Sequence, residues 1–106
     1  MKYPKEYLDE IKTRLKVSSV VSKSVNLKKR GKEFVGLSPF KTEKTPSFTV
    51  NDEKGFYHCF STAEHGNIFD FIMKTQNLKF GEAVKYLANL AGMRPYTFSK
   101  QDEERE

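Results

Sequence analysis

The sequence predicts an α+β domain in which two antiparallel β-hairpins are flanked by N- and C-terminal helices. Apolar residues recur at helical spacing near the N-terminus and again over residues 68–91. Between them, over residues 25–60, short strand-like runs alternate with turns that contain glycine. The chain has 106 residues, which is enough for one domain and too few for two.

The N-terminal part of the chain predicts two helices. The first covers residues 4–15, because four apolar residues recur there at helical spacing and Pro4 suits a first turn. A short second helix follows, and we expect Ser18 or Ser19 to cap its N-terminus.

The middle of the chain predicts the two hairpins. The first is formed by two short runs on either side of Gly31, in the segment VNLKKRGKEFVGL. After a loop, SPFKTEKTP, the strand PSFTV, the turn NDEKG and the strand FYHCF form the second hairpin. Asp52 and Gly55 are expected to supply its turn chemistry. The segment STAEHG that follows is expected to be a loop.

The C-terminal part predicts two further helices. Asn67 is expected to cap a helix over IFDFIMK, and Asp70, three residues later, completes a capping box. The last helix runs from about residue 80 to residue 91, where Gly92 fits its C-terminal end. We therefore expect one domain over residues 1–95.

Composition narrows the class of function. Nineteen Lys and Arg residues against fourteen Asp and Glu give a net charge of +5, which favours an anionic partner such as nucleic acid. Part of the acidic charge lies in residues 96–106, a segment expected to be a linker toward a further domain. A single cysteine excludes an internal disulfide. With no long apolar run and no signal peptide, we expect a cytoplasmic protein that has no membrane partner.

Strand alternation divides the second hairpin into two faces. Lys54, Phe56 and His58 are expected on the face that mixes charge with aromatic rings. The residues expected on the opposite, apolar face are Phe48, Val50, Tyr57 and Cys59.

In the first hairpin, Lys28 and Arg30 share one face, and Lys32 and Phe34 share a face as well. Two such hairpins side by side would form a basic sheet that carries aromatic rings. Surfaces of this kind bind single-stranded nucleic acid, because cations neutralise phosphates while rings stack on bases. The alternative is a solvated charged strand edge that deters aggregation.

Three segments carry a resemblance to a known family: VNLKKRGKEFVGLSPF, EKTPSFTV, and FYHCF followed by HGNIFDF. Together they resemble the CHC-type zinc-binding domain that opens bacterial DnaG primases, from the first helix to about Arg94. The resemblance implies a zinc-ribbon-like fold. It also implies that the domain recognises the single-stranded DNA template and helps to initiate RNA primers for replication.

In primases of this type, RNA synthesis belongs to a following polymerase domain, a magnesium-dependent nucleotidyltransferase that is absent from these residues. We therefore expect the chain to carry no catalytic site of its own. The implied partners are the polymerase domain, in cis or in trans, and the replicative helicase through the full-length protein. An alternative is that the domain mainly docks on these proteins. A small enzyme built on His58 and Cys59 is disfavoured, because adjacent strand residues point apart.

The chain departs from the family at its zinc ligands. The family pattern is Cys-Pro-x-His followed by Cys-x-x-Cys, whereas this chain has Ser-Pro-Phe-Lys and Cys-Phe-Ser-Thr. The degenerate ligand positions are Ser38, Lys41, Cys59 and Thr62. Because hydroxyls and an ammonium are poor zinc ligands, we expect neither a metal nor another cofactor in this domain.

Something other than zinc is then expected to hold the two loops. We expect hydrogen bonds from Ser38, Ser61 and Thr62 to do this, with Phe40 and Phe60 packed between the loops. His58 and His65 are close in sequence to Cys59, but His58 is expected on the opposite strand face and so cannot easily converge with it.

The resemblance also implies DNA-facing positions. Carried over residue by residue they are Lys28, Lys32, Lys44, Pro46, Lys54, Phe56 and His58, to which we add Arg30 and Phe34. The lysines would neutralise phosphates, Phe56 would stack on a base, and His58 would contact a base or sugar.

Overall fold

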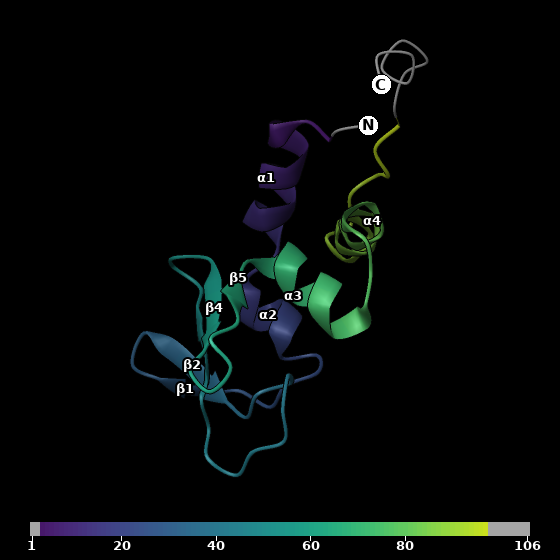
Figure 1. The fold of residues 1–106 in the computed structure, drawn as a ribbon. Coiled ribbons are helices and arrows are strands. Elements are labelled where there is room, and N and C mark those ends of the chain that lie inside the picture. Colours follow the sequence, from purple (N-terminus) through teal and green to yellow (C-terminus); the bar gives the residue numbers. More distant parts are fainter. Residues whose placement is uncertain (1–2, 98–106) are drawn as a thin grey trace.

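The computed structural model describes residues 3–97. Within them, four helices and five strands follow in an order that Figure 1 shows. The elements are α1 (Lys5–Arg14), α2 (Val17–Val21), β1 (Lys28–Arg30), β2 (Glu33–Gly36), β3 (Phe48–Asn51), β4 (Phe56–Cys59), β5 (His65–Gly66), α3 (Ile68–Gln76) and α4 (Phe80–Leu90).

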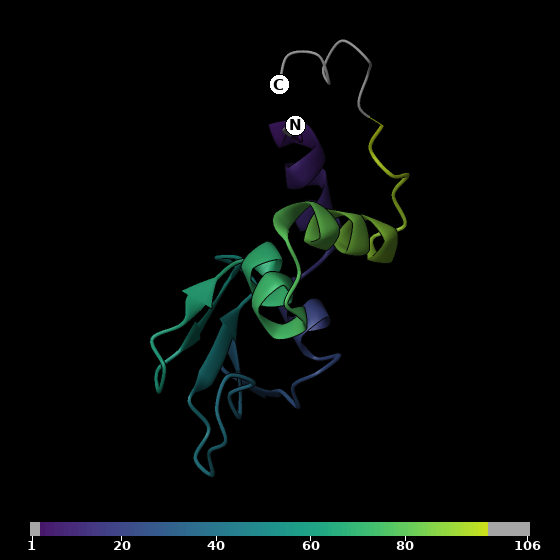
Figure 2. The ribbon, with the colours of Figure 1, turned by 45° about the vertical axis from the view of Figure 1, so that its right-hand side comes forward.

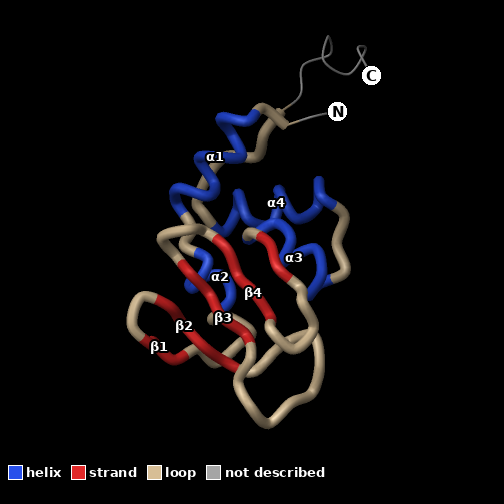
Figure 3. Tube along the Cα trace, turned by 60° about the vertical axis from the view of Figure 1, so that its left-hand side comes forward, coloured by secondary structure: helices blue, strands red, loops and turns tan. Residues whose placement is uncertain are grey.

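The strands form one antiparallel sheet in the order β1-β2-β3-β4-β5. Both predicted hairpins are present, and pairing of β2 with β3 joins them. The helices stand to one side of the sheet in Figure 2, and α2 and α3 lie behind it in Figure 3. Within residues 3–97, the sheet therefore has an inner face, packed against helices, and an outer face without helices.

The core lies between the inner face and the helices. All four residues that alternation assigned to the apolar face are at most 1% exposed, which confirms that prediction. The ring centroids of Phe48 and Tyr57 are 5.4 Å apart, and that of Phe71 on α3 lies 5.6 Å from Tyr57. Buried aromatic area of this size gives a small domain much of its stability.

The start of α3 is built as expected. The Asn67 side chain accepts hydrogen bonds from the backbone N–H groups of Phe69 (2.9 Å) and Asp70 (3.1 Å). The Asp70 carboxylate accepts one from the Asn67 N–H at 3.0 Å. The predicted capping box is therefore confirmed.

The expected cap of α2 is wrong. This helix begins at Val17, so that Ser18 lies within its first turn rather than before it. The Ser18 N–H and hydroxyl both donate to the Asp52 carboxylate, at 2.8 and 2.5 Å. Asp52 thus ties the β3–β4 turn to the positive end of α2. Asn51, whose side chain accepts from the Lys54 N–H, shapes the turn together with Gly55, whose φ is 76°.

The expectation of a loop over His65 and Gly66 is wrong, because these two residues form a fifth strand. They pair with β4, with Gly66 opposite Tyr57. A Cβ at Gly66 would collide with the Asp70 side chain, so a glycine lets this short strand pass close to the start of α3.

The chain after α4 returns to the N-terminal helix. The Tyr96 ring lies 5.2 Å from that of Tyr7, and the Tyr7 hydroxyl donates to the Arg94 carbonyl at 2.8 Å. Apart from its first two residues, the predicted linker 96–106 lies outside the described residues. Across residues 3–97, no helix is long and apolar enough to cross a membrane.

Candidate nucleic-acid interface

One cross-strand row on the outer face of the sheet contains one residue from each of the five strands. Its members, each directly opposite the next, are Lys28, Val35, Thr49, His58 and His65. Residues directly opposite in antiparallel strands share a face, so this row fixes which side chains the outer face presents. The face combines a cation on β1 with two imidazole rings, His58 on β4 and His65 on β5.

Aromatic rings line β4 on the outer face. Phe56 and His58 are two positions apart and share it, as strand alternation predicts. Phe60 follows at the same spacing and is 68% exposed, while Phe56 is 55% exposed. The centroids of the His58 and Phe60 rings are 4.3 Å apart. Two large exposed rings in line on one strand are more than a plain solvent face requires.

The expected position of Phe60, packed between the loops, is wrong. Its N–H donates to the Ser47 carbonyl at 2.9 Å, which extends the β3–β4 pairing by one residue beyond Cys59. Strand alternation therefore continues and turns the Phe60 ring outward. Sequence reasoning also left Phe60 out of the DNA-facing set, although its two-residue spacing from His58 was a signal.

Four of the predicted cationic residues lie on β1 or in the turns of the two hairpins. Lys28 and Arg30 are exposed on β1, Lys32 stands in the β1–β2 turn and Lys54 in the β3–β4 turn. Phe34 is not brought to the outer face. It is opposite the fully buried Val50 and packs, partly buried, against the core.

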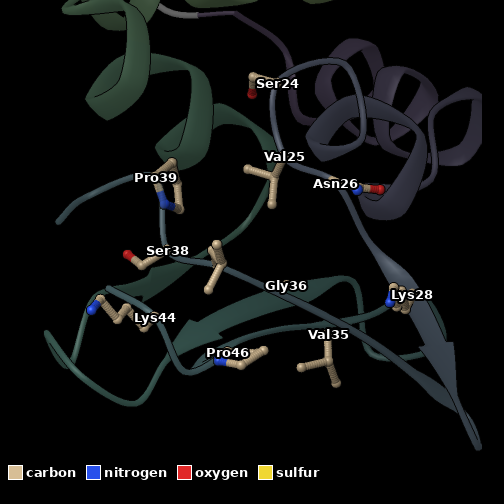
Figure 4. A pocket seen from close by; sticks show the side chains of 11 residues that line it. Ser24, Val25, Asn26, Lys28, Val35, Gly36, Ser38, Pro39, Lys44 and Pro46 are labelled. Atoms are coloured by element: carbon tan, nitrogen blue, oxygen red, sulfur yellow. The ribbon is translucent and has the colours of Figure 1, made fainter. Parts of the chain in front are cut away.

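A hollow of about 470 Å³ opens beside β1 and β2. Lys28, Lys44 and Pro46, three of the predicted DNA-facing residues, line it. In Figure 4 the two lysines stand on opposite sides, with Val35 and Pro46 between them. This volume falls in the range of small-ligand pockets, and its cations suit an anionic group.

The two loops that resemble zinc loops meet at a carboxylate. Glu43 accepts hydrogen bonds from the backbone N–H groups of Ser38 (2.9 Å) and Ser47 (3.2 Å), and from the Ser47 hydroxyl (2.8 Å). The Ser47 and Ser61 hydroxyl oxygens are 2.8 Å apart, which links the first loop to the second. Donation from the Ser38 N–H, and then from the Ser47 hydroxyl, lowers the pKa of Glu43.

Cys59 is fully buried next to Ser38 and Ser61 of this hydrogen-bonded group. Its Sγ lies 3.2 Å from the Ser38 Oγ and 3.3 Å from the Ser61 Oγ. Burial raises the pKa of the Cys59 thiol, but hydrogen bonds from the Ser38, Ser61 and Thr62 hydroxyls outweigh it and lower the pKa to about 6. The expected contacts of Ser38 and Ser61 between the two loops are therefore present, whereas the Thr62 hydroxyl accepts from the Glu64 N–H within the second loop.

Sequence reasoning missed Glu43 and Ser47. An acidic residue in a loop gives no signal of its own, and the groups that Glu43 accepts from are largely backbone N–H groups, whose positions depend on the folded loop. Lys41, the remaining degenerate ligand position, is exposed.

Residues 3–104 match the family model described as the CHC2 zinc finger of DnaG primases. The chain belongs to this family. It is 43% identical to the DNA primase of Haemophilus influenzae over 94 residues, 47% to that of Pseudomonas putida over 90, and 46% to that of Escherichia coli over 85. These matches cover 88, 85 and 80% of this chain but only 16, 14 and 15% of the relatives, so the chain spans a small part of their length.

A solved structure agrees with the fold. The Aquifex aeolicus primase, solved with its zinc-binding and RNA polymerase domains, superposes with a TM-score of 0.79 at 27% identity. The match covers 92% of this chain and 25% of that one. The predicted zinc-ribbon-like α+β fold of a DnaG N-terminal domain is confirmed.

The residues at the family's ligand positions do not fit a zinc ion. A structural zinc site takes four Cys or His ligands, whereas these positions offer one thiol, two hydroxyls and an ammonium. His58 and His65 lie on the outer face, and Cys59 is buried on the inner one. Over residues 3–97, no group of three or more His, Cys, Asp or Glu side chains is placed to hold a metal.

Proposed function

We propose that this domain binds the single-stranded DNA template of a DNA primase and helps to start RNA primers on it. One observation carries the proposal. Phe56 and Phe60 are both exposed on the helix-free face of the sheet, with His58 between them. Exposed rings flanked by cations suit bases and phosphates at the same time.

The free energies of base stacking and of association together determine how tightly the isolated domain would bind the template. Each stacked base contributes roughly 1–3 kcal/mol. Two stacked bases would then be comparable to the lower part of the roughly 4–15 kcal/mol that association costs in lost freedom. We therefore expect weak binding by the isolated domain. Attachment to the polymerase domain would raise the effective concentration of the template face.

The wider role follows from the relatives. A protein that contains this domain would be a primase, a nucleotidyltransferase whose polymerase domain uses magnesium, acting in the cytoplasm at the replication fork. A contact with the replicative helicase would belong to that full-length protein. The DNA-facing set proposed for this chain is the predicted one without Phe34 and with Phe60 added, because burial removes the first and exposure adds the second.

Replacing Lys28 and Lys54 by Ala should weaken single-strand binding and flatten its salt dependence. Each phosphate contact on a single strand contributes about 0.7 to the slope of log K against log salt, so the slope should fall by about 1.4. Fluorescence anisotropy with labelled single-stranded DNA at several salt concentrations measures this.

The matched control is Lys5→Ala with Lys85→Ala, which removes the same charge from exposed positions on α1 and α4. An equal loss in both double variants would mean that net charge, not the outer face, governs binding. No binding by the unmodified chain at low salt, together with binding to the polymerase domain, would favour the protein-docking alternative.

A further inference from the structure

The two loops at the family's ligand positions have to be held together, a task that zinc performs elsewhere in this family. Structural zinc sites contribute folding free energy directly, and domains that depend on them unfold when the metal is removed. This chain keeps the family fold, yet three of its four ligand positions carry side chains that bind zinc poorly. Something else therefore closes the first loop and joins it to the second.

We propose that a hydrogen-bonded cluster centred on the Glu43 carboxylate replaces the zinc ion as the junction of the two loops, and that the backbone around it still has the geometry of a zinc site. The cluster, called the loop junction below, consists of Ser38, Glu43, Ser47, Cys59 and Ser61.

The carboxylate closes the first loop as a metal would, by accepting from both of its ends. The Ser38 N–H is at the start of the loop and the Ser47 N–H at its end, and both donate to the same Glu43 oxygen. A carboxylate offers about four acceptor positions, so one side chain can hold several donors at once. Hydrogen bonds to a charged acceptor are among the stronger ones in proteins.

Hydroxyls then carry the connection to the second loop. The Ser47 hydroxyl lies next to that of Ser61, and the buried Cys59 thiol sits between the Ser61 and Ser38 hydroxyls. The cluster thus forms a closed ring of contacts between the two loops. Such a network holds a single arrangement only when its buried members are satisfied, and here each of the five has a partner.

Packing supports the same loop from the core side. The Phe40 ring centroid lies 6.0 Å from those of Phe48 and Tyr57 and 6.5 Å from that of Phe71. The Phe40 N–H donates to the Ser38 hydroxyl at 3.0 Å. The first loop is therefore fixed by an aromatic anchor as well as by the carboxylate.

The distances between the ligand positions indicate that the side chains differ from those of a zinc site while the backbone geometry is kept. The Ser38 Oγ and Cys59 Sγ are 3.2 Å apart. Two thiolates on one tetrahedral zinc ion lie about 3.8 Å apart, given Zn–S bonds of about 2.3 Å. Thr62 lies in the same tight turn as Cys59, because the Ala63 N–H donates to the Cys59 carbonyl at 2.8 Å.

The first test is metal content and thermal melting of the whole chain, purified from zinc-supplemented medium, with and without a chelator. We expect far less than one zinc per chain and an unchanged melting temperature. Glu43→Gln should lower the melting temperature by several degrees, whereas Glu53→Gln, in the exposed β3–β4 turn, should not. One zinc per chain with a chelator-sensitive melt, or equal melting of both variants, would overturn the proposal.

The second test restores the ligands. The triple variant Ser38→Cys, Lys41→His, Thr62→Cys, with the native Cys59, should bind one zinc per chain and become sensitive to chelator. Cobalt, used as a spectroscopic substitute, should give a tetrahedral spectrum. The same triple variant with Cys59→Ser should bind metal much more weakly. A folded triple variant that takes no metal would overturn the claim of a preserved backbone, and the first test stands on its own if the triple variant does not fold.

Discussion

Replacing both Phe56 and Phe60 by Ala should reduce affinity for single-stranded DNA by at least about 30-fold. Each ring is expected to stack on one base, and each stacked base is worth roughly 1–3 kcal/mol, so the double variant loses roughly 2–6 kcal/mol. Because both side chains are more than half exposed, their removal should leave the melting temperature nearly unchanged. Loss of binding would then not come from loss of folding.

The matched control is Tyr86→Ala, which removes an exposed ring from α4, away from the sheet. Its affinity should equal that of the unmodified chain. The measurement is anisotropy of labelled single-stranded DNA, made on the domain and, where binding is too weak, on a full-length primase that carries the same changes. Equal affinities for the double variant and the control would remove the aromatic face from the proposed interface.

Periodicity along single strands predicted much of this architecture. The alternation of Phe48 and Val50 with polar neighbours settled which face would be buried, because side chains in a strand have a period of two. The same rule placed Phe56 and His58 outside. The Asn67 cap was equally local, since all three of its hydrogen bonds span no more than three residues. Features of this kind are determined by residues close together in the sequence and can be predicted from them.

What the sequence did not predict depends on contacts between distant residues. Ser18 and Asp52 are 34 positions apart, and nothing near Asp52 indicates that its carboxylate leaves the turn to bind α2. Strand β5 is only two residues long and exists because β4 offers it a free edge. The position of Phe60 differs from the expectation because the end of a strand, unlike its middle, is set by its pairing partner, here the Ser47 carbonyl.

The loop junction borders part of the surface proposed to meet DNA, because Ser38 lines the same hollow as Lys28 and Lys44. Cys59 is fully buried on the inner side of β4, while its neighbour His58 belongs to the outer face. A change at the loop junction is therefore expected to move Lys44 and Pro46, which lie in the loop that Glu43 closes, more than Phe56 and His58 on β4.

Stability should rise with pH between about 6 and 9, and Cys59 should be the cause. Hydrogen bonds from neighbouring hydroxyls outweigh burial and lower the pKa of its thiol to about 6 in the folded chain, against roughly 8.5 when unfolded. A group with a lowered pKa stabilises the fold fully above its unfolded pKa, and this contribution is lost as the pH falls through its folded pKa.

The difference between these two pKa values sets an upper limit of about 3.4 kcal/mol on the contribution of the thiol. Because Ser61, one of the donors, is exposed to solvent, we expect roughly 2 kcal/mol after screening, or about 10 °C in melting temperature. Glu43, the carboxylate in the same cluster, has a lowered pKa and stays ionised over this range, so it adds no slope.

The comparison protein is Cys59→Ser, whose hydroxyl can still bond to Ser38 and Ser61 but does not titrate in this range. Every other titrating group is common to both proteins, so the difference between their melting curves at pH 6 and pH 9 isolates the thiol. Thiolate absorbance in the ultraviolet gives the folded pKa independently. If both proteins gained the same stability with pH, or if the thiol titrated near its ordinary value, the hydroxyls at the loop junction would not be stabilising a thiolate.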